Sequence, residues 1–194
     1  MNTIHSNREQ WLNAAVEELR PLFEANGKPL PANIRVACGF PSNAKRSGAI
    51  GECWSDAASA DKTFEVLISP TLDDPMRVFD VLVHELCHST AGAMNHGVAF
   101  ADIAMKMHLD PCGPKSKPWK ATKAGTQFKD QFSPLVETLG AYPHAKLTIV
   151  NRTVQSTRML KAFCPTCGYT VRLTAKWAAV GLPICPADSS IFVL

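Results

Sequence analysis

The chain of 194 residues lacks any apolar run of about eighteen residues, the length a helix needs to cross a bilayer. Its first residues, Met1 to Arg8, also lack the apolar stretch of a secretory signal peptide. The seven cysteines are an odd number and include a Cys-x-x-Cys pair, which favours metal ligation over a disulfide framework. We therefore expect a cytoplasmic protein with no membrane partner.

A short motif near the middle of the chain combines two histidines with a glutamate. His84, Glu85 and His88 form the pattern H-E-x-x-H. Positions i and i+4 share one face of a helix, so the two imidazoles can bind one zinc ion. Glu85 would then lie beside the open side of the metal, where it can accept a proton from a bound water. Alternatively, the two histidines are ordinary core or surface residues of a helix.

The flanking residues predict that this motif lies on a buried helix. Asp73 and Asp74 offer an N-cap, and Pro75 suits the first helical position. Gly92 is a suitable residue for ending the helix. Apolar residues recur between these limits at helical spacing, namely Val78, Phe79, Leu82, Val83 and Leu86.

Two familiar third ligands are missing from the sequence. No glutamate occurs between Glu85 and Glu137, which argues against the zincin class that takes its third ligand from a glutamate on the next helix. Ala91 and Met94 occupy the places where the metzincin pattern has glycine and histidine. His96 is therefore the predicted third ligand, presented just after a turn.

A second helix is expected from Val98 to His108. His108 competes with His96 as a ligand but lies about three turns along this helix, so we interpret it as a surface or helix-end histidine. Asp102 is either a carboxylate that orients a ligand imidazole or part of a solvated helix face. Cys87 points away from the face of the two motif histidines and is expected to be a small buried residue.

The order of the remaining segments predicts an α+β fold. An amphipathic helix is expected over residues 8–24, with a capping box at Ser6 to Glu9, followed by strands at 34–38, 49–54 and 63–69. The strand Thr63–Ser69 directly precedes the motif helix and is our candidate for an edge strand that pairs with extended substrate. Residues 111–145 are rich in Pro, Lys and Gly and are interpreted as a basic connector.

A second cysteine pattern occupies the C-terminal part. Cys164, Cys167, Cys185 and Asp188 match the spacing of a zinc ribbon, except that an aspartate stands in the fourth place. This set predicts a structural zinc site within residues 146–194. His144 or solvent could supply the fourth ligand instead, or the ribbon could fold with weakly bound metal or none.

Charge is distributed unevenly along the chain. Residues 1–110 carry nine Lys and Arg against fourteen Asp and Glu, whereas residues 111–194 carry eleven against three. A basic C-terminal part suggests a polyanion as partner, and DNA contact is expected there. The lysines at 115, 117, 120 and 123 fit either this partner or a soluble linker equally well.

Cations with interleaved aromatic residues surround the ribbon cysteines. Basic side chains neutralise phosphate and exposed aromatic rings stack on bases. Tyr169 and Trp177 could instead form the small core of the ribbon, and for Trp177 we expect the core. The predicted nucleic-acid-binding residues are Arg152, Arg158, Lys161, Arg172 and Lys176.

Two stretches resemble the SprT-like zinc metallopeptidases. The first is the H-E-L-C-H stretch with its later His96-Gly97, preceded by Ile68-Ser69-Pro70-Thr71-Leu72. The second resembles the zinc ribbon of bacterial and phage members and comprises Cys164-Pro-Thr-Cys167-Gly-Tyr169, Lys176-Trp177 and Gly181-Leu182-Pro183. Asp188 departs from the family's Cys or His, which puts the ribbon metal in doubt but not the catalytic site.

This resemblance implies a minimal zincin fold with His84, His88 and His96 as zinc ligands and Glu85 as catalytic base. It also implies a protease that acts on proteins bound or crosslinked to DNA. We expect a zincin-like domain at 1–110, a connector at 111–145 and a ribbon at 146–194. The alternatives are a nucleic-acid-binding ribbon protein with a residual protease site, and a protein whose histidines hold metal for stability only.

Overall fold

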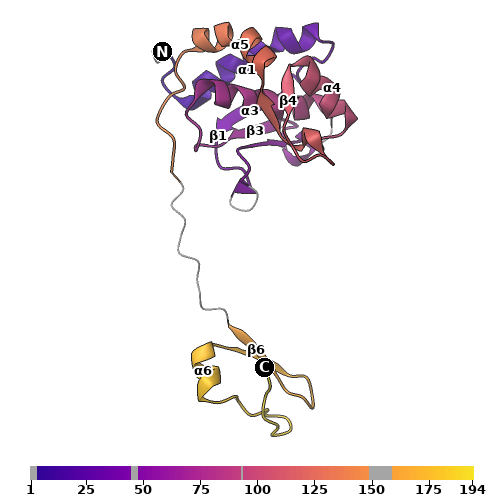
Figure 1. The fold of residues 1–194 in the computed structure, drawn as a ribbon, viewed down its shortest axis with the longest axis vertical. Coiled ribbons are helices and arrows are strands. Elements are labelled where there is room, and N and C mark those ends of the chain that lie inside the picture. The colour runs from indigo at the N-terminus through magenta and orange to yellow at the C-terminus, as the bar shows by residue number, and fades with distance from the viewer. Residues whose placement is uncertain (1–3, 45–47, 93, 149–158) are drawn as a thin grey trace. The chain divides into compact units, whose positions relative to one another are not determined.

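The computed structural model describes residues 4–44, 48–92, 94–148 and 159–194 (Figure 1). The chain divides into two compact units, residues 1–149 and residues 150–194. Both contain helices and short strands, so the mixed α+β class is confirmed. Within the described ranges, no helix is both long and apolar enough to cross a membrane.

A three-stranded sheet forms one layer of the first unit. Its strands are β1 (Ile34–Cys38), β2 (Gly51–Trp54) and β3 (Phe64–Ile68), in the order β1-β3-β2. β3 pairs parallel to β1 and antiparallel to β2. The expectation that residues 63–69 form an edge strand is therefore wrong, because β3 is the central strand. The edge strand that lies alongside the motif helix is β2.

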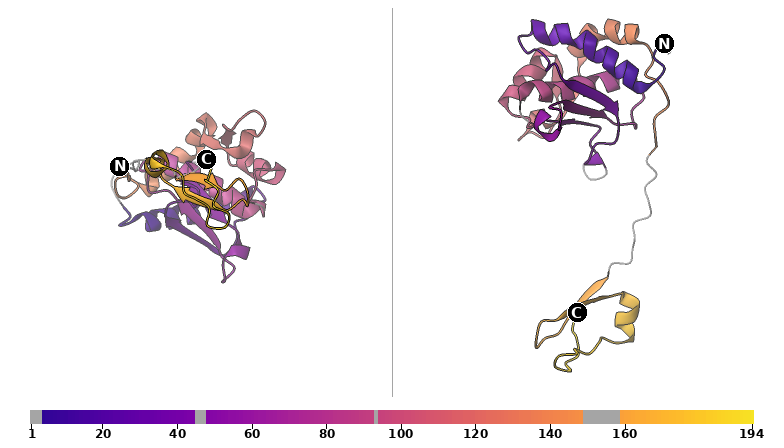
Figure 2. Two further views of the ribbon diagram at one scale, coloured as in Figure 1. Left: turned by 90° about the horizontal axis from the view of Figure 1, so that it is seen from below. Right: turned by 180° about the vertical axis from the view of Figure 1, so that it is seen from behind.

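The first helix, α1 (Arg8–Ala25), covers this sheet and confirms the helix expected at 8–24. Figure 2 shows α1 crossing the strands on the side that also carries the other helices of the unit. Its N-cap is Asn7, whose side chain accepts a hydrogen bond from the backbone N–H of Gln10. The capping box expected at Ser6 and Glu9 does not form, because the Ser6 hydroxyl donates to the side chain of Gln10 instead.

The motif helix is α3 (Pro75–Ala91), with limits close to those predicted. Asp74 caps it by accepting from the backbone N–H of Arg77 at 2.7 Å. Gly92 ends it in the left-handed region at φ 66°, a conformation that glycine adopts without steric cost. The next helix along the chain is α4 (Val98–Lys106). A short 3-10 helix, η1 (Asp56–Ala58), lies earlier in the chain, between β2 and β3.

Residues 111–145 are not a connector but part of the first unit. They contribute to a hairpin of β4 (Leu109–Pro111) and β5 (Thr122–Ala124), with the 3-10 helix η2 (Pro118–Lys120) between the strands. Helix α5 (Thr126–Leu139) follows and packs against α1 and α3.

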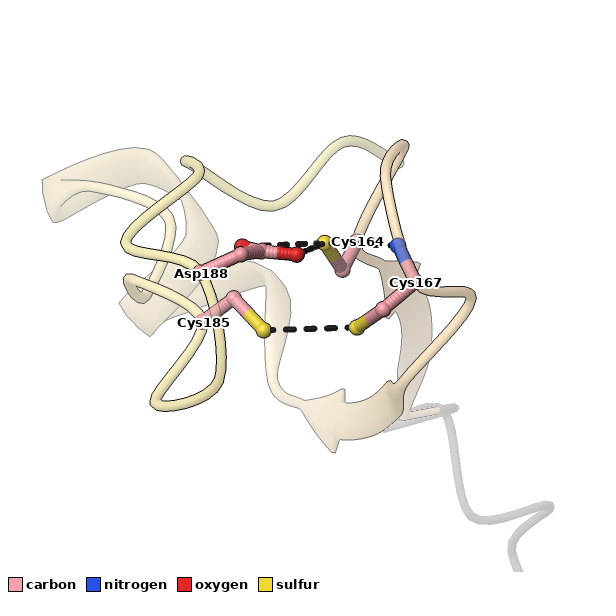
Figure 3. Close-up of side chains that lie close together, drawn as sticks. All are labelled: Cys164, Cys167, Cys185 and Asp188. Atoms are coloured by element: carbon pink, nitrogen blue, oxygen red, sulfur yellow. Dashed lines mark hydrogen bonds between the residues drawn. The ribbon is translucent and has the colours of Figure 1, made fainter.

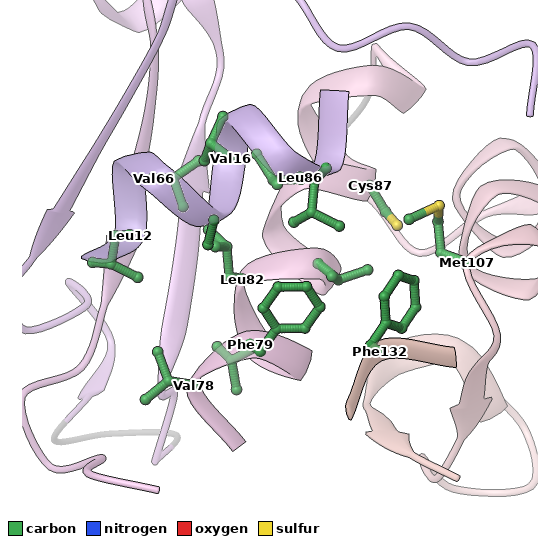
Figure 4. Close-up of a cluster of buried hydrophobic side chains, with 14 of the residues drawn as sticks. Leu12, Val16, Val66, Val78, Phe79, Leu82, Leu86, Cys87, Met107 and Phe132 are labelled. Atoms are coloured by element: carbon green, nitrogen blue, oxygen red, sulfur yellow. The ribbon is translucent and has the colours of Figure 1, made fainter. Parts of the chain in front are cut away.

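The core of the first unit lies between α1, α3, α5 and the sheet (Figure 4). Phe79 of α3 packs on Phe132 of α5 with ring centroids 5.4 Å apart. Cys87 is fully buried in the same core, as expected for a small apolar residue that is not a ligand. Removing α5 would expose Phe79, and the ring of Tyr142 packs on Trp11 of α1 in the same core, so the unit needs the chain to about residue 142.

The second unit is small and built around the cysteines. Strands β6 (Leu160–Phe163) and β7 (Thr170–Leu173) pair antiparallel, and α6 (Ala175–Val180) follows them. Its buried cluster consists of Ala162, Cys164, Cys185 and Phe192. Trp177 was expected in this core but is 59% exposed, because Phe192 fills the space beside Tyr169 at a centroid distance of 5.9 Å.

Candidate metal centres

The structure brings His84, His88 and His96 together at one point of the first unit. The Nε2 atom of His96 lies 3.2 Å from Nε2 of His84 and 3.2 Å from Nε2 of His88. A zinc ion with four tetrahedral ligands and Zn–N bonds of about 2.0–2.1 Å separates neighbouring nitrogens by roughly 3.3 Å. The three imidazoles are therefore spaced as ligands of one such ion.

Local sequence explains why these three residues converge. His84 and His88 are one helical turn apart on α3 and share a face. The chain reverses at Gly92, and the side chain of Asn95 then accepts a hydrogen bond from the backbone N–H of Gly97 at 2.9 Å. This small turn precedes α4 and directs His96 back towards the face of α3.

Phe100 of α4 forms a wall behind the imidazoles. Its ring centroid lies 4.8, 4.4 and 4.9 Å from those of His84, His88 and His96, respectively. Phe100 is itself buried, so it keeps water from this side of the three rings. Phe100 falls within the helix expected from Val98 to His108, but sequence reasoning assigned it no role at the site.

Thr122 of β5 orients one of the imidazoles. Its hydroxyl oxygen lies 2.8 Å from Nδ1 of His84. With the proton on Nδ1, His84 donates to Thr122 and presents the lone pair of Nε2 to a metal. Thr122 is buried, and the sequence missed it because residues 111–145 were interpreted as a connector.

Asp80 attaches β5 to the motif helix one turn before His84. Its buried carboxylate accepts from Nη1 of Arg77 at 2.7 Å and from the backbone N–H of Ala124 at 3.2 Å. Asp80 and His84 therefore contact the same short strand from successive turns of α3. These two contacts hold the hairpin against the candidate metal centre.

Two other candidates lie away from the imidazoles. Asp102 forms ion pairs with Lys28 at 3.4 Å and Lys106 at 3.3 Å on a partly exposed face of α4, so it does not orient a ligand. His108 follows the end of α4 with φ 58° and is a helix-end histidine, as expected. Neither residue belongs to the group of converging nitrogens.

Glu85 is almost completely buried beside β2. A Cβ atom at Gly51 would collide with Oε1 of Glu85 and lie 2.7 Å from Cγ1 of Val81, so only glycine fits there. Burial, assisted by the carboxylate of Glu52, raises the pKa of Glu85 to about 8. A nearby cation would lower this pKa again, and a base with a pKa near neutrality accepts and returns protons efficiently.

His84 and His96 are in the protonation state that binds metal. Burial and the neighbouring His88 and His96 lower the pKa of His84 to about 3. Burial, followed by the charge of Lys120, also lowers the pKa of His96. Both side chains are therefore neutral near pH 7, and a metal ion does not have to displace a proton from either of them.

A second group of possible ligands lies in the second unit and contains all four residues predicted from the spacing (Figure 3). The sulfur atoms of Cys167 and Cys185 are 3.5 Å apart, and Oδ2 of Asp188 is 3.2 Å from the sulfur of Cys164. Zn–S bonds of about 2.3 Å imply S–S separations of roughly 3.8 Å and S–O separations of roughly 3.5 Å. The four side chains fit such a site after small adjustments.

Asp188 is held in place as the fourth member of this group. Its Oδ1 atom accepts a hydrogen bond from the backbone N–H of Ser190 at 2.9 Å. That bond, together with the thiol of Cys164, lowers the pKa of Asp188 to about 2, so the carboxylate is ionised at neutral pH. His144, the alternative fourth ligand, belongs to the first unit and is not part of the group.

The predicted nucleic-acid residues are only partly described. Lys161 of β6, Arg172 of β7 and Lys176 of α6 lie in the second unit, and the ammonium group of Lys176 is 5.3 Å from the ring centroid of Trp177. A hollow of about 670 Å³ is lined by Arg172 and Trp177, among others. Arg152 and Arg158 lie outside the described residues.

Comparisons with protein-family models, with curated proteins and with solved structures found no match.

Proposed function

We propose that the protein is a zinc-dependent endopeptidase with a zincin-like fold of the SprT type. The observation that carries this proposal is the convergence of three imidazoles, two of them from an H-E-x-x-H helix on which the buried Glu85 directly follows His84. A metal held only for stability needs no buried base with a raised pKa at its side. The arrangement therefore favours hydrolysis over a purely structural role.

His84, His88 and His96 would hold the zinc ion, which lowers the pKa of a bound water and polarises a carbonyl group when present. Glu85 accepts the proton of the attacking water and passes it to the leaving amine. Thr122 keeps the ring of His84 in the ligand orientation. Phe100 excludes water from the opposite side of the imidazoles.

The edge strand β2 is the part of the fold suited to binding an extended substrate. It pairs with β3 on one side only, and no described strand pairs with its outer edge. Gly51, at the start of β2, is in contact range of Glu85. Main-chain pairing along β2 would therefore bring a peptide bond close to the base.

We propose proteins bound or crosslinked to DNA as the substrate class. Support comes from the second unit, where Arg172, Lys176 and the exposed ring of Trp177 combine phosphate-binding cations with a stacking surface. The four-residue group of Cys164, Cys167, Cys185 and Asp188 would bind a structural zinc ion that fixes these elements.

The test uses the full chain loaded with zinc and a DNA-bound protein as substrate. Glu85→Gln is expected to lower the cleavage rate by at least about 100-fold, because the proton acceptor is lost. Glu137→Gln makes the same change at an exposed position on α5 and should leave the rate unchanged. Equal, background-level cleavage by the wild type and Glu85→Gln would reject the peptidase proposal.

A further inference from the structure

A cavity opens next to the metal centre on the side of His96. It has a volume of about 860 Å³ and lies between the start of α4 and the segment around η2. His96 itself forms part of the lining, so the cavity begins at the point where the three imidazoles converge. A cavity of this size, within the range of about 300–1,000 Å³ typical of ligand sites, accommodates a side chain of a peptide held over the metal.

The charged groups of this cavity are predominantly positive. Lys117 and Lys120 line it, and neither takes part in an ion pair among the described residues. Asp102 also lines it, but that carboxylate is already paired with both Lys28 and Lys106. Among the described residues, the lining therefore holds two lysines without ion pairs and one carboxylate that is already paired.

The remaining walls are apolar. Val98, Met105 and Trp119 line the cavity, and Val98 is 88% exposed despite its aliphatic side chain. Apolar walls suit the methylene groups of a side chain rather than the evenly charged backbone of a nucleic acid. The lysines then suit a carboxylate at the tip of that side chain.

We propose that this cavity binds an acidic side chain of the protein substrate near the scissile bond, with Lys117 and Lys120 as the specificity-determining residues. The inference rests on the proposed peptidase function for its substrate class. Glutamate matches the lining best, because its two methylene groups can contact Val98 and Met105 while its carboxylate reaches the ammonium groups.

The experiment compares two pools of labelled peptides that differ at one central position, glutamate in one pool and glutamine in the other, with degenerate flanking residues. Cleavage is measured with the zinc-loaded full chain, and binding with its Glu85→Gln variant. Each of these two measurements is repeated after introducing the double substitution Lys117→Glu/Lys120→Glu into the same protein. Lys129→Glu on α5 is the charge control, because it is exposed and does not line the cavity.

The glutamate pool should bind and be cleaved about 2- to 30-fold better, since two partly exposed charge pairs together contribute about 0.4–2 kcal/mol and about 1.4 kcal/mol is a factor of ten. The double variant should lose or invert this preference, and Lys129→Glu should keep it. Equal binding of the two pools, or a preference that survives the double variant, would overturn the inference. If neither pool is cleaved but the glutamate pool still binds better, the result rejects the peptidase function and leaves the binding inference standing.

A duplex oligonucleotide serves as a competitor in the same binding assay. If it does not displace the glutamate pool from the wild type, the cavity is not its site, as expected. If it displaces that pool from the wild type, and its own binding is lost in the Lys117→Glu/Lys120→Glu variant, the two lysines bind nucleic acid and the inference is wrong.

Discussion

Replacing Thr122 by valine removes the hydroxyl that orients His84 while preserving the shape of the side chain. The affected hydrogen bond joins Oγ1 of Thr122 to Nδ1 of His84 over 2.8 Å. Thr122 is only 8% exposed, so little water is available to replace its hydroxyl. We expect Thr122→Val to weaken zinc binding at the three imidazoles without unfolding the protein.

The magnitude follows from the burial of the contact. Leaving a buried donor without a partner costs about 1–3 kcal/mol. Loss of a group that orients a metal-binding histidine typically lowers metal affinity by about 10- to 100-fold, which corresponds to a similar free energy. An increase in zinc dissociation constant of about 10- to 100-fold is therefore the expected result for Thr122→Val.

The assay is a zinc competition with a chromophoric chelator, carried out on the full chain with Cys167→Ser and Cys185→Ser to remove the ribbon ligands. Thr122→Ser keeps the hydroxyl and should retain most of the affinity. Thr138→Val makes the same substitution at an exposed position of α5 and should bind zinc as the parent does. An affinity of Thr122→Val within about twofold of the parent would refute the orienting role of Thr122.

Three further predictions concern separate parts of the molecule. Gly51→Ala should displace the side chain of Glu85. The rate of peptide cleavage should then fall, while the zinc content, measured by elemental analysis, should stay unchanged. Phe132→Ala should lower the free energy of unfolding in urea by about 3–5 kcal/mol, because its ring is buried against Phe79. A loss below about 0.5 kcal/mol would mean that α5 is not part of the core. Asp188→Ala should lose the zinc of the ribbon to a chelator that is too weak to remove it from the parent protein. Asp188→Cys should keep this zinc in the presence of the same chelator.

The sequence was sufficient to place the motif helix and the third histidine. Asp74 and Gly92 are local signals that act within one turn, so they fix the ends of α3 without tertiary information. His96 followed from the absence of other ligands within reach, and the structure places its Nε2 atom beside those of His84 and His88.

The sequence was misleading where tertiary packing decides the structure. Residues 111–145 have the composition of a linker, but Phe128 and Phe132 lie one helical turn apart, before Pro134, and are buried against Phe79 of α3. Because this segment was interpreted as a connector, the contact between Thr122 and His84 could not be predicted. A hydrogen bond between residues 38 positions apart has no local sequence signal.

The strand order and the ribbon core were unpredictable for a related reason. Thr63–Ser69 precedes α3 in the chain, yet strand pairing is decided across the sheet, and β3 lies between β1 and β2. Trp177 looked like the largest apolar group available to the ribbon, but Phe192, near the end of the chain, occupies the core. Spacing alone placed Cys164, Cys167, Cys185 and Asp188 correctly, because a metal site constrains spacing directly.

The proposed zinc centre is tested most directly by elemental analysis of purified protein and two variants. We expect about two zinc ions per chain in the wild type, one in His96→Ala and one in Cys167→Ser, since each substitution removes a ligand from a different group. A His96→Ala variant that retains as much zinc as the wild type would contradict the claim that His84, His88 and His96 form one metal centre.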